Sequence, residues 1–199
     1  MNKKIILFLM ACLLAGCTQT PKSTPSNVSW QTHLQQLNTL DTWSFRGKVA
    51  VITPEDRHSL NIYWQQLDDE FHITLTTFIG GTVLELNKTK QFTEIIDSKG
   101  KHYYGEDTES LIKDLSGLVI PVQALQQWIK GNPANASYLL NSNNQVLSLS
   151  GFDYKNIPWE ITYSDYMPTE NVYLPKKVGL KQQDIRLKFA ISEWEIDPR

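Results

Sequence analysis

Hydrophobic and polar positions alternate along most of the chain from residue 43 onward. Trp43, Phe45 and Val49 share one parity, and Ser44 and Arg46 share the other. This period of two is typical of a strand with one buried face. Alternating runs recur between turn residues, and they predict strands over 43–51, 60–65, 71–76, 82–87, 92–97, 138–140, 146–150, 159–163, 178–180 and 185–191. Short strands with polar turns indicate a meander of antiparallel strands.

Three segments follow a helical period instead. Apolar residues at i, i+4 and i+7 predict a helix over 29–38. A second helix begins at Asp107, a capping residue, and ends at Gly117, while a third begins at Pro121 and ends at Gly131. Strands before and after the last two helices predict one curved antiparallel sheet with helices over its concave face. The apolar face of such a sheet would line a pocket, and the helices would form its lid.

The N-terminal segment carries an export signal. A short basic region precedes an uncharged apolar run, residues 5–14, which is too short for a bilayer span of roughly 20 residues. The run ends in Leu14-Ala15-Gly16-Cys17, which resembles the lipobox of bacterial lipoproteins. We therefore predict a signal peptide over 1–16, acylation of Cys17, a flexible tether over 17–28, and a single domain over 29–199. The alternative is an ordinary cleavable signal with an incidental cysteine.

The composition of the chain argues against some classes of binding partner and against a disulfide. The chain has 19 basic and 21 acidic residues, and removal of residues 1–16 changes the net charge from −2 to about −4. A basic stripe with interleaved aromatic residues is missing from the sequence, which argues against nucleic acid. Cys12 would leave with the signal peptide and Cys17 would carry lipid, so we predict no disulfide. Six Trp, eight Tyr and seven Phe residues supply a large apolar area, some of which could line a cavity.

The sequence offers little catalytic or metal-binding chemistry. Its four histidines lack the spacing of a metal site, and it has no nucleophile elbow, phosphate-binding glycine loop or Cys-x-x-Cys motif. We therefore predict no catalytic residue, no metal and no cofactor apart from covalent lipid on Cys17. The acidic run over 68–70 fits a solvated turn. A cell-wall glycan hydrolase stays open as an alternative, because the separation of a catalytic carboxylate pair is a property of the fold.

The connection after the strand over 71–76 is unusual. Phe78, Ile79 and Gly80 occupy a hairpin turn where polar residues are normally favoured. Either both large side chains fold back under the sheet, or they form an exposed apolar tip of the kind that marks a partner or membrane contact. Arg46 is most simply an exposed strand residue, although a gating role at the mouth of the pocket is also considered.

Several segments, in order, resemble a known family. They are WSFRGKV at 43–49, YWQQ at 63–66, GGTVLEL at 80–86, IP at 120–121, LQQWIKGNP at 125–133, Trp159 and the closing segment 185–194. Their order behind a lipobox is similar to the LolB family of outer-membrane lipoprotein receptors, over nearly the whole mature chain. The resemblance separates this chain from the related soluble periplasmic carrier, which lacks an anchor.

The resemblance implies a mainly β fold with α-helices: an unclosed antiparallel β-barrel of about 11 strands with a helical lid over an apolar cavity. It implies a monomer, lipid-anchored at the outer membrane of a Gram-negative bacterium and facing the periplasm. The implied activity is to accept acylated lipoproteins from a soluble periplasmic carrier and insert them into the outer membrane, without nucleotide hydrolysis. Residues assigned to the cavity and lid are Trp43, Phe45, Val49, Leu60, Ile62, Trp64, Phe71, Ile73, Leu75, Leu115, Leu125, Trp128, Trp159, Leu187 and Phe189.

Carried over by position, the membrane-insertion loop spans 77–81 and its tip is Ile79. The family pattern has leucine preceded by proline there, where this chain has Ile79 preceded by Phe78, so which of the two projects stays open. The tryptophans fit either a filled core or a lined cavity. A structural or assembly-factor envelope lipoprotein with a simply filled core is therefore a further alternative.

Overall fold

A computed structural model describes residues 28–153 and 155–198. The predicted signal peptide, Cys17 with its predicted acylation, and nearly all of the predicted tether lie outside the described residues.

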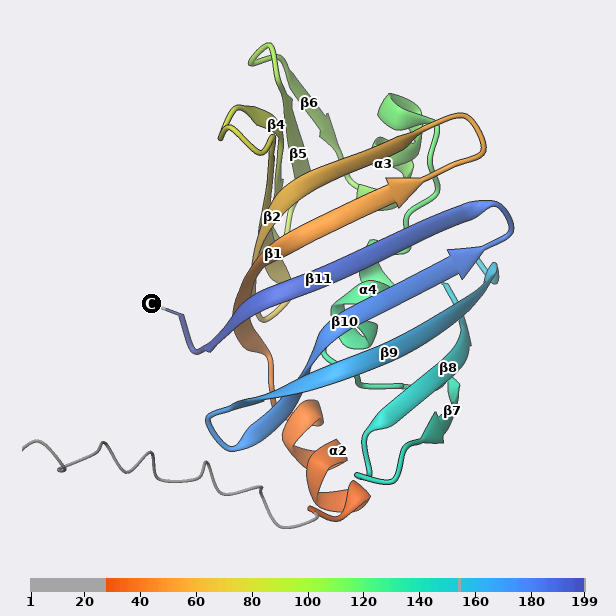
Figure 1. The fold of residues 1–199 in the computed structure, drawn as a ribbon. Helices are drawn as coiled ribbons and strands as arrows, with labels where there is room; N and C mark the ends of the chain where they lie inside the picture. The colour runs from red at the N-terminus through yellow and green to blue at the C-terminus, as the bar shows by residue number, and fades with distance from the viewer. Residues whose placement is uncertain (1–27, 154, 199) are drawn as a thin grey trace, which may run out of the picture.

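One antiparallel sheet of eleven strands dominates the fold (Figure 1). Its order is β6-β5-β4-β3-β2-β1-β11-β10-β9-β8-β7, so the first and last strands pair at its centre while β6 and β7 form its two edges. The strands are β1 Thr42–Ile52, β2 Arg57–Leu67, β3 Glu70–Thr76, β4 Thr82–Lys88, β5 Thr93–Asp97, β6 His102–Gly105, β7 Ser137–Leu140, β8 Val146–Phe152, β9 Pro158–Thr169, β10 Val172–Gln182 and β11 Ile185–Ile196. The predicted unclosed antiparallel sheet is confirmed.

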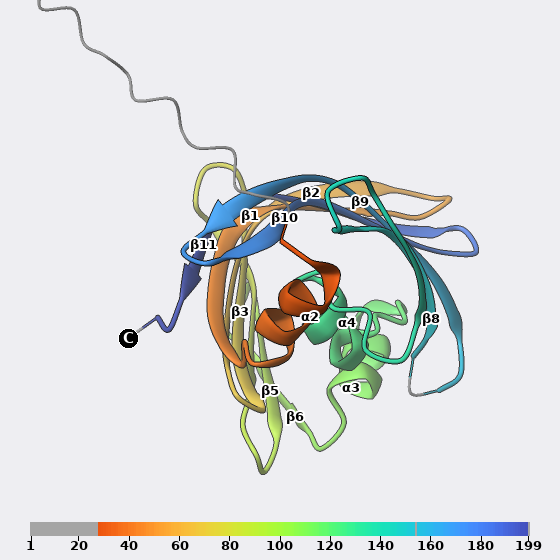
Figure 2. The ribbon, with the colours of Figure 1, turned by 90° about the horizontal axis from the view of Figure 1, so that it is seen from below.

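Three helices lie inside the curve of the sheet (Figure 2): α2 Trp30–Asn38, α3 Thr108–Ser116 and α4 Val122–Trp128. Ser29 caps α2 by accepting a hydrogen bond from the backbone of Thr32, and Asp107 caps α3 in the same way through Ser110. Gly117 ends α3 in the left-handed conformation, at φ 74°. Within the described part of the chain, no helix is both long and apolar enough to cross a membrane.

The structure adds one strand, β6, and extends several of the predicted strands, among them β9, β10 and β11. β6 was not predicted because its four residues are too few to show an alternation. β10 begins at Val172, before Pro175, although proline normally interrupts a central strand. Its first part pairs with β9 alone, and pairing with β11 begins only at Lys177, so the missing N–H group of Pro175 leaves no ladder hydrogen bond unmade between β10 and β11.

A bulge shifts the register where β1 and β11 cross the centre of the sheet. Arg46 lies opposite Glu193, but the next residue, Gly47, lies opposite Ile191. A Cβ atom on Gly47 would stand 2.4 Å from the carbonyl oxygen of Ala190, so only glycine allows this close approach of the two backbones.

Candidate functional site

Aromatic side chains from three neighbouring strands, β2, β1 and β11, form the centre of the interior. The ring of Trp43 lies 5.5 Å from that of Trp64 and 5.4 Å from that of Trp194, and the ring of Phe45 lies 6.4 Å from that of Phe189. These alternate positions point to the concave face because the bulge keeps both strands in phase there. All five side chains are buried, so the concave face presents a continuous apolar surface to the helices.

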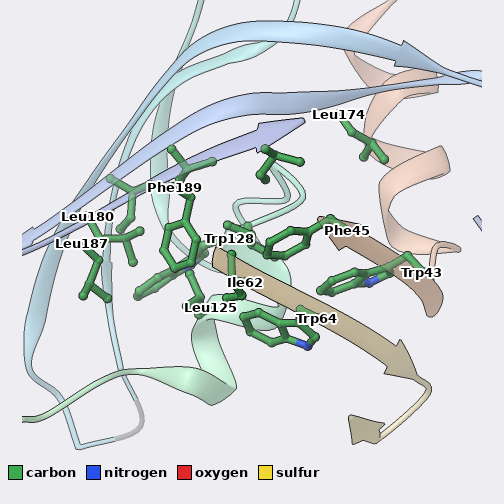
Figure 3. Packing of buried hydrophobic residues seen from close by; sticks show 14 of the residues in the cluster. Trp43, Phe45, Ile62, Trp64, Leu125, Trp128, Leu174, Leu180, Leu187 and Phe189 are labelled. Carbon is green, nitrogen blue, oxygen red and sulfur yellow. The ribbon is translucent and has the colours of Figure 1, made fainter. Parts of the chain in front are cut away.

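Helix α4 covers this surface. Leu125 and Trp128 are buried and lie between the Phe45 side of the cluster and a second group that includes Leu187 and Phe189 (Figure 3). They face inward because they are three residues apart on one side of the helix. Sheet and lid therefore share one hydrophobic cluster.

Most of the predicted cavity and lid residues meet in this cluster. Those that are buried are Trp43, Phe45, Val49, Ile62, Trp64, Phe71, Ile73, Leu125, Trp128, Trp159, Leu187 and Phe189. Leu60 and Leu75 are partly buried and pack against it. The inward position predicted for Leu115 is wrong: it is 41% exposed, because residues 113–117 at the end of α3 all extend into solvent. Leu111 and Ile112, one turn earlier, contact the cluster instead.

The sequence did not identify several interior residues. Trp194 is buried and hydrogen bonds through its indole N–H to the carbonyl of Pro175 at 2.8 Å, yet it breaks the alternation of Leu187, Phe189 and Ile191. The bulge in β11 adds one residue and so reverses the parity. Leu174 also lies in the cluster, upstream of the strand predicted over 178–180. Its own alternation was hidden by the adjacent Pro175.

Polar contacts tie the C-terminal end of α4 to the sheet and to the segment between α2 and β1. Tyr163 donates a hydrogen bond to the carbonyl of Trp128 at 2.7 Å. The buried ammonium group of Lys130 donates to the carbonyl of Leu40 at 2.6 Å, and burial lowers the pKa of this lysine to about 8, opposed by the charge of Asp41. These bonds fix one end of the lid, since each would leave a buried polar group unpaired if broken.

Helix α3 is joined to α4 by a buried carboxyl group. Oε1 of Glu109 accepts a hydrogen bond from the backbone N–H of Gln123 at 3.1 Å, in the first turn of α4. Burial raises the pKa of Glu109 to about 7; the Gln123 bond lowers it, and the charges of Asp153 and Asp107 raise it further. Glu109 is the one buried residue of α3, so this helix is held less firmly than α4.

The β3–β4 loop forms the second part of the site. Its backbone is closed by hydrogen bonds from Thr77 N to the Gly81 carbonyl at 2.8 Å and from Gly80 N to the Thr77 carbonyl at 3.0 Å. Gly80 has φ +90°, a conformation that side chains disfavour. Phe78 is 89% exposed and Ile79 is 78% exposed. The alternative in which both fold back under the sheet is therefore wrong, and the tip presents two apolar side chains.

Arg46 lies on the outer face of β1, with its guanidinium 4.3 Å from the centre of the Tyr63 ring. The gating role considered for it is wrong, because this position is on the opposite face of the sheet from the cluster. Among residues 28–153 and 155–198, no group of three histidine, cysteine or acidic side chains has the geometry to hold a metal ion.

The sequence of this chain is similar to known outer-membrane lipoproteins. The family model described as "Outer membrane lipoprotein LolB" matches residues 41–194. The outer-membrane lipoprotein LolB of Psychromonas ingrahamii is 51% identical over 193 residues, which cover 96% of this chain and 94% of that protein. The LolB protein of Tolumonas auensis is 36% identical over 192 residues, covering 96% of each chain.

Solved structures agree at the level of the fold. A LolA superfamily protein from Nitrosomonas europaea superposes with a TM-score of 0.53 at 6% identity, covering 86% of this chain and 95% of the other. A DUF1329 family protein from Desulfovibrio piger gives a TM-score of 0.51 at 7% identity, covering 84% and 90%. With a family match across most of its length and relatives this similar over almost the entire sequence, the chain belongs to the LolB family of outer-membrane lipoproteins.

Proposed function

We propose that this protein accepts acylated lipoproteins from a soluble periplasmic carrier and inserts them into the outer membrane. The acyl chains of the cargo occupy the apolar interior under the lid, and the Phe78–Ile79 tip enters the membrane. Neither a catalytic residue nor a nucleotide takes part. Lipid on Cys17 anchors the protein, as a monomer, with its domain facing the periplasm. Family membership, the aromatic interior and the exposed tip support this proposal.

The energetics of lipid in water require direct transfer. Exposure of an acyl chain costs about 0.8 kcal/mol per methylene group, so two or three long chains amount to some tens of kcal/mol. Release into water would therefore be far too slow to deliver cargo. A carrier that passes its chains to the interior of this protein avoids that step, and increasing affinity along the route gives transfer its direction.

The lid must move to admit cargo. The interior side chains pack against one another, so acyl chains enter where a helix separates from the sheet. Helix α3 is the element to move first, since Glu109 is its one buried residue, whereas α4 buries three, and its last turn is exposed. The bonds of Tyr163 and Lys130 keep the end of α4 in place meanwhile.

The exposed tip is the observation that carries the proposal. Two large apolar side chains held in water by a closed backbone loop are unfavourable for an isolated protein, because burial of each would gain about 1.5–3 kcal/mol. Contact with a bilayer recovers that free energy. Membership of a family of outer-membrane lipoproteins favours the bilayer over a protein partner as the surface that covers the tip.

The test is transfer of a labelled lipoprotein from the carrier to this protein and then to vesicles. Ile79→Glu should accept cargo normally but insert it at least tenfold more slowly, because a carboxylate resists entry into the bilayer. Leu139→Glu is the matched control, since Leu139 is 66% exposed on the edge strand β7, and it should insert cargo at the wild-type rate. Phe78→Glu, compared with Ile79→Glu, identifies which side chain enters more deeply. Normal insertion by both tip variants would overturn the role of the loop, and failure of the wild-type protein to accept cargo would overturn the function.

A further inference from the structure

A groove of about 550 Å³ runs along the outer face of the sheet, opposite the aromatic cluster. It crosses β1, β2, β3 and β11, and its polar lining includes Arg46, Lys48, Tyr63, Thr74, Thr76 and Ser192. Nothing in lipoprotein transfer through the interior uses this face.

Two cations give the groove its charge. Arg46 and Lys48 are two residues apart on β1, so both side chains point outward about 7 Å apart. Neither forms an ion pair with a described residue, and no carboxylate belongs to the described residues that line the groove. Glu193 lies opposite Arg46 in the sheet, but the guanidinium stacks over Tyr63 of β2, on the other side of β1.

The groove begins at the root of the apolar loop. Lys48 lies opposite Asn61, and Asn61 lies opposite Thr76, which lines the groove one residue before the loop. The side chain of Asn61 donates a hydrogen bond to the Thr77 carbonyl at 3.0 Å, which fixes the root. Two strand spacings separate Lys48 from Thr76, a distance of about 10 Å. Figures 1 and 2 show the loop, drawn in yellow, on the outer side of the sheet, away from the helices.

We propose that this groove binds the phosphate of a phospholipid headgroup in the membrane that the loop enters. Arg46 and Lys48 supply the positive charge, and the hydroxyl groups of Thr74 and Thr76 supply hydrogen bonds. The inference rests on the proposed entry of the loop. With the tip in the acyl region, the root of the loop and the adjoining groove lie at the level of the headgroups. An acidic protein segment would also suit the charge, but the position beside an apolar tip favours lipid.

The experiment measures loop insertion by the acylated full-length mature protein in vesicles. A polarity-sensitive dye on Phe78→Cys reports burial of the loop in phosphatidylcholine vesicles with and without 30% phosphatidylglycerol. Each cation near an anionic surface contributes about fivefold to association, so the two together contribute about 25-fold. Arg46→Gln/Lys48→Gln should lose most of the gain that phosphatidylglycerol gives and keep insertion into phosphatidylcholine.

Arg186→Gln/Lys188→Gln is the matched control. These two cations lie on the outer face of β11, outside the groove and without ion pairs to described residues. The control should retain the phosphatidylglycerol effect. If both double variants lost the phosphatidylglycerol effect equally, any surface cation would attract the anionic membrane, and headgroup binding in the groove would be overturned. An unchanged phosphatidylglycerol effect in Arg46→Gln/Lys48→Gln would overturn it as well.

A second experiment, with a soluble short-chain lipid, distinguishes a failure of this inference from a failure of the proposed function. Dihexanoyl phosphatidylglycerol, below its micelle concentration, should shift the amide resonances of Tyr63 and Thr76 in the wild type and not in Arg46→Gln/Lys48→Gln. Inorganic phosphate at the same concentration should shift them several-fold less. If the dye on the loop never reports burial but the lipid still shifts these resonances, insertion of the loop is refuted and binding of the headgroup in the groove is not. Shifts caused by a poly-glutamate peptide and not by the lipid would overturn the headgroup in favour of an acidic protein.

Discussion

Replacement of Glu109 by glutamine should make the fold more stable at alkaline pH. The folded protein raises the pKa of this buried carboxyl from 4.5 to about 7, so folding favours its protonated form. Between these values the folded state binds more protons than the unfolded state, and stability therefore falls as pH rises through this window. The full shift corresponds to at most about 3.4 kcal/mol at 1.36 kcal/mol per pKa unit. Because polar groups around a buried carboxylate reorient when it ionises and weaken the penalty of burial, we expect about 1–2 kcal/mol.

Urea unfolding of wild type and Glu109→Gln at several values from pH 4 to pH 8.5 tests this. The glutamine keeps an acceptor for the Gln123 N–H group, so the two proteins should have similar stability at pH 4 and differ by about 1–2 kcal/mol at pH 8.5, in favour of the variant. Glu106→Gln, an exposed neighbour outside α3, should run parallel to wild type. Parallel profiles for Glu109→Gln and wild type over the whole range would refute the assignment of a buried, neutral carboxyl group.

Substitutions at three further positions test the packing around the site by chemical unfolding. Gly47→Ala should cost about 2 kcal/mol or more, because its new methyl group would overlap the Ala190 carbonyl at the bulge; a cost below about 0.5 kcal/mol would contradict the close approach. Lys130→Ala should cost about 3 kcal/mol through a cavity and an unpaired carbonyl. Because the folded pKa of Lys130 is lowered to about 8, wild-type stability should rise between pH 8 and 10, and Lys130→Met should flatten that rise. Tyr163→Phe should cost about 1 kcal/mol by removal of the bond to Trp128.

The strand pattern could be predicted where one face of a strand is buried and the other is solvated. β1, β2 and β3 satisfy this condition, and their alternation is visible in the sequence. β10 does not, because Pro175 and two lysines interrupt its pattern, and its pairing depends on which neighbour each half has. Pairing across the sheet is a property of the whole fold, so a single strand's sequence does not contain it.

The residues of the candidate site also divide into those that the sequence predicts and those that it does not. Trp43, Phe45 and Trp64 could be placed on the interior face by parity alone. Trp194 could not, because a bulge in β11 reverses the parity between it and Phe189. On α3, Leu115 follows the apolar stripe of the helix, but where the helix passes beyond the sheet depends on packing that periodicity does not report. Phe78 and Ile79 differ from these residues, because their exposure follows from the glycines and backbone hydrogen bonds that close the turn.

The energies of the interior explain how a packed protein could also be a receptor. Movement of α3 exposes side chains such as Leu111 and Ile112, which pack against the cluster, each at a cost of up to about 1.5–3 kcal/mol, so an open lid in water costs a few kcal/mol. One 16-carbon acyl chain gains about 12 kcal/mol on leaving water. The cluster can therefore close on itself in the absence of cargo and still yield to it. In the proposed transfer, the bonds of Tyr163 and Lys130 remain when α3 moves, so we expect the opening to reverse without loss of register and the interior to close again after the chains leave it.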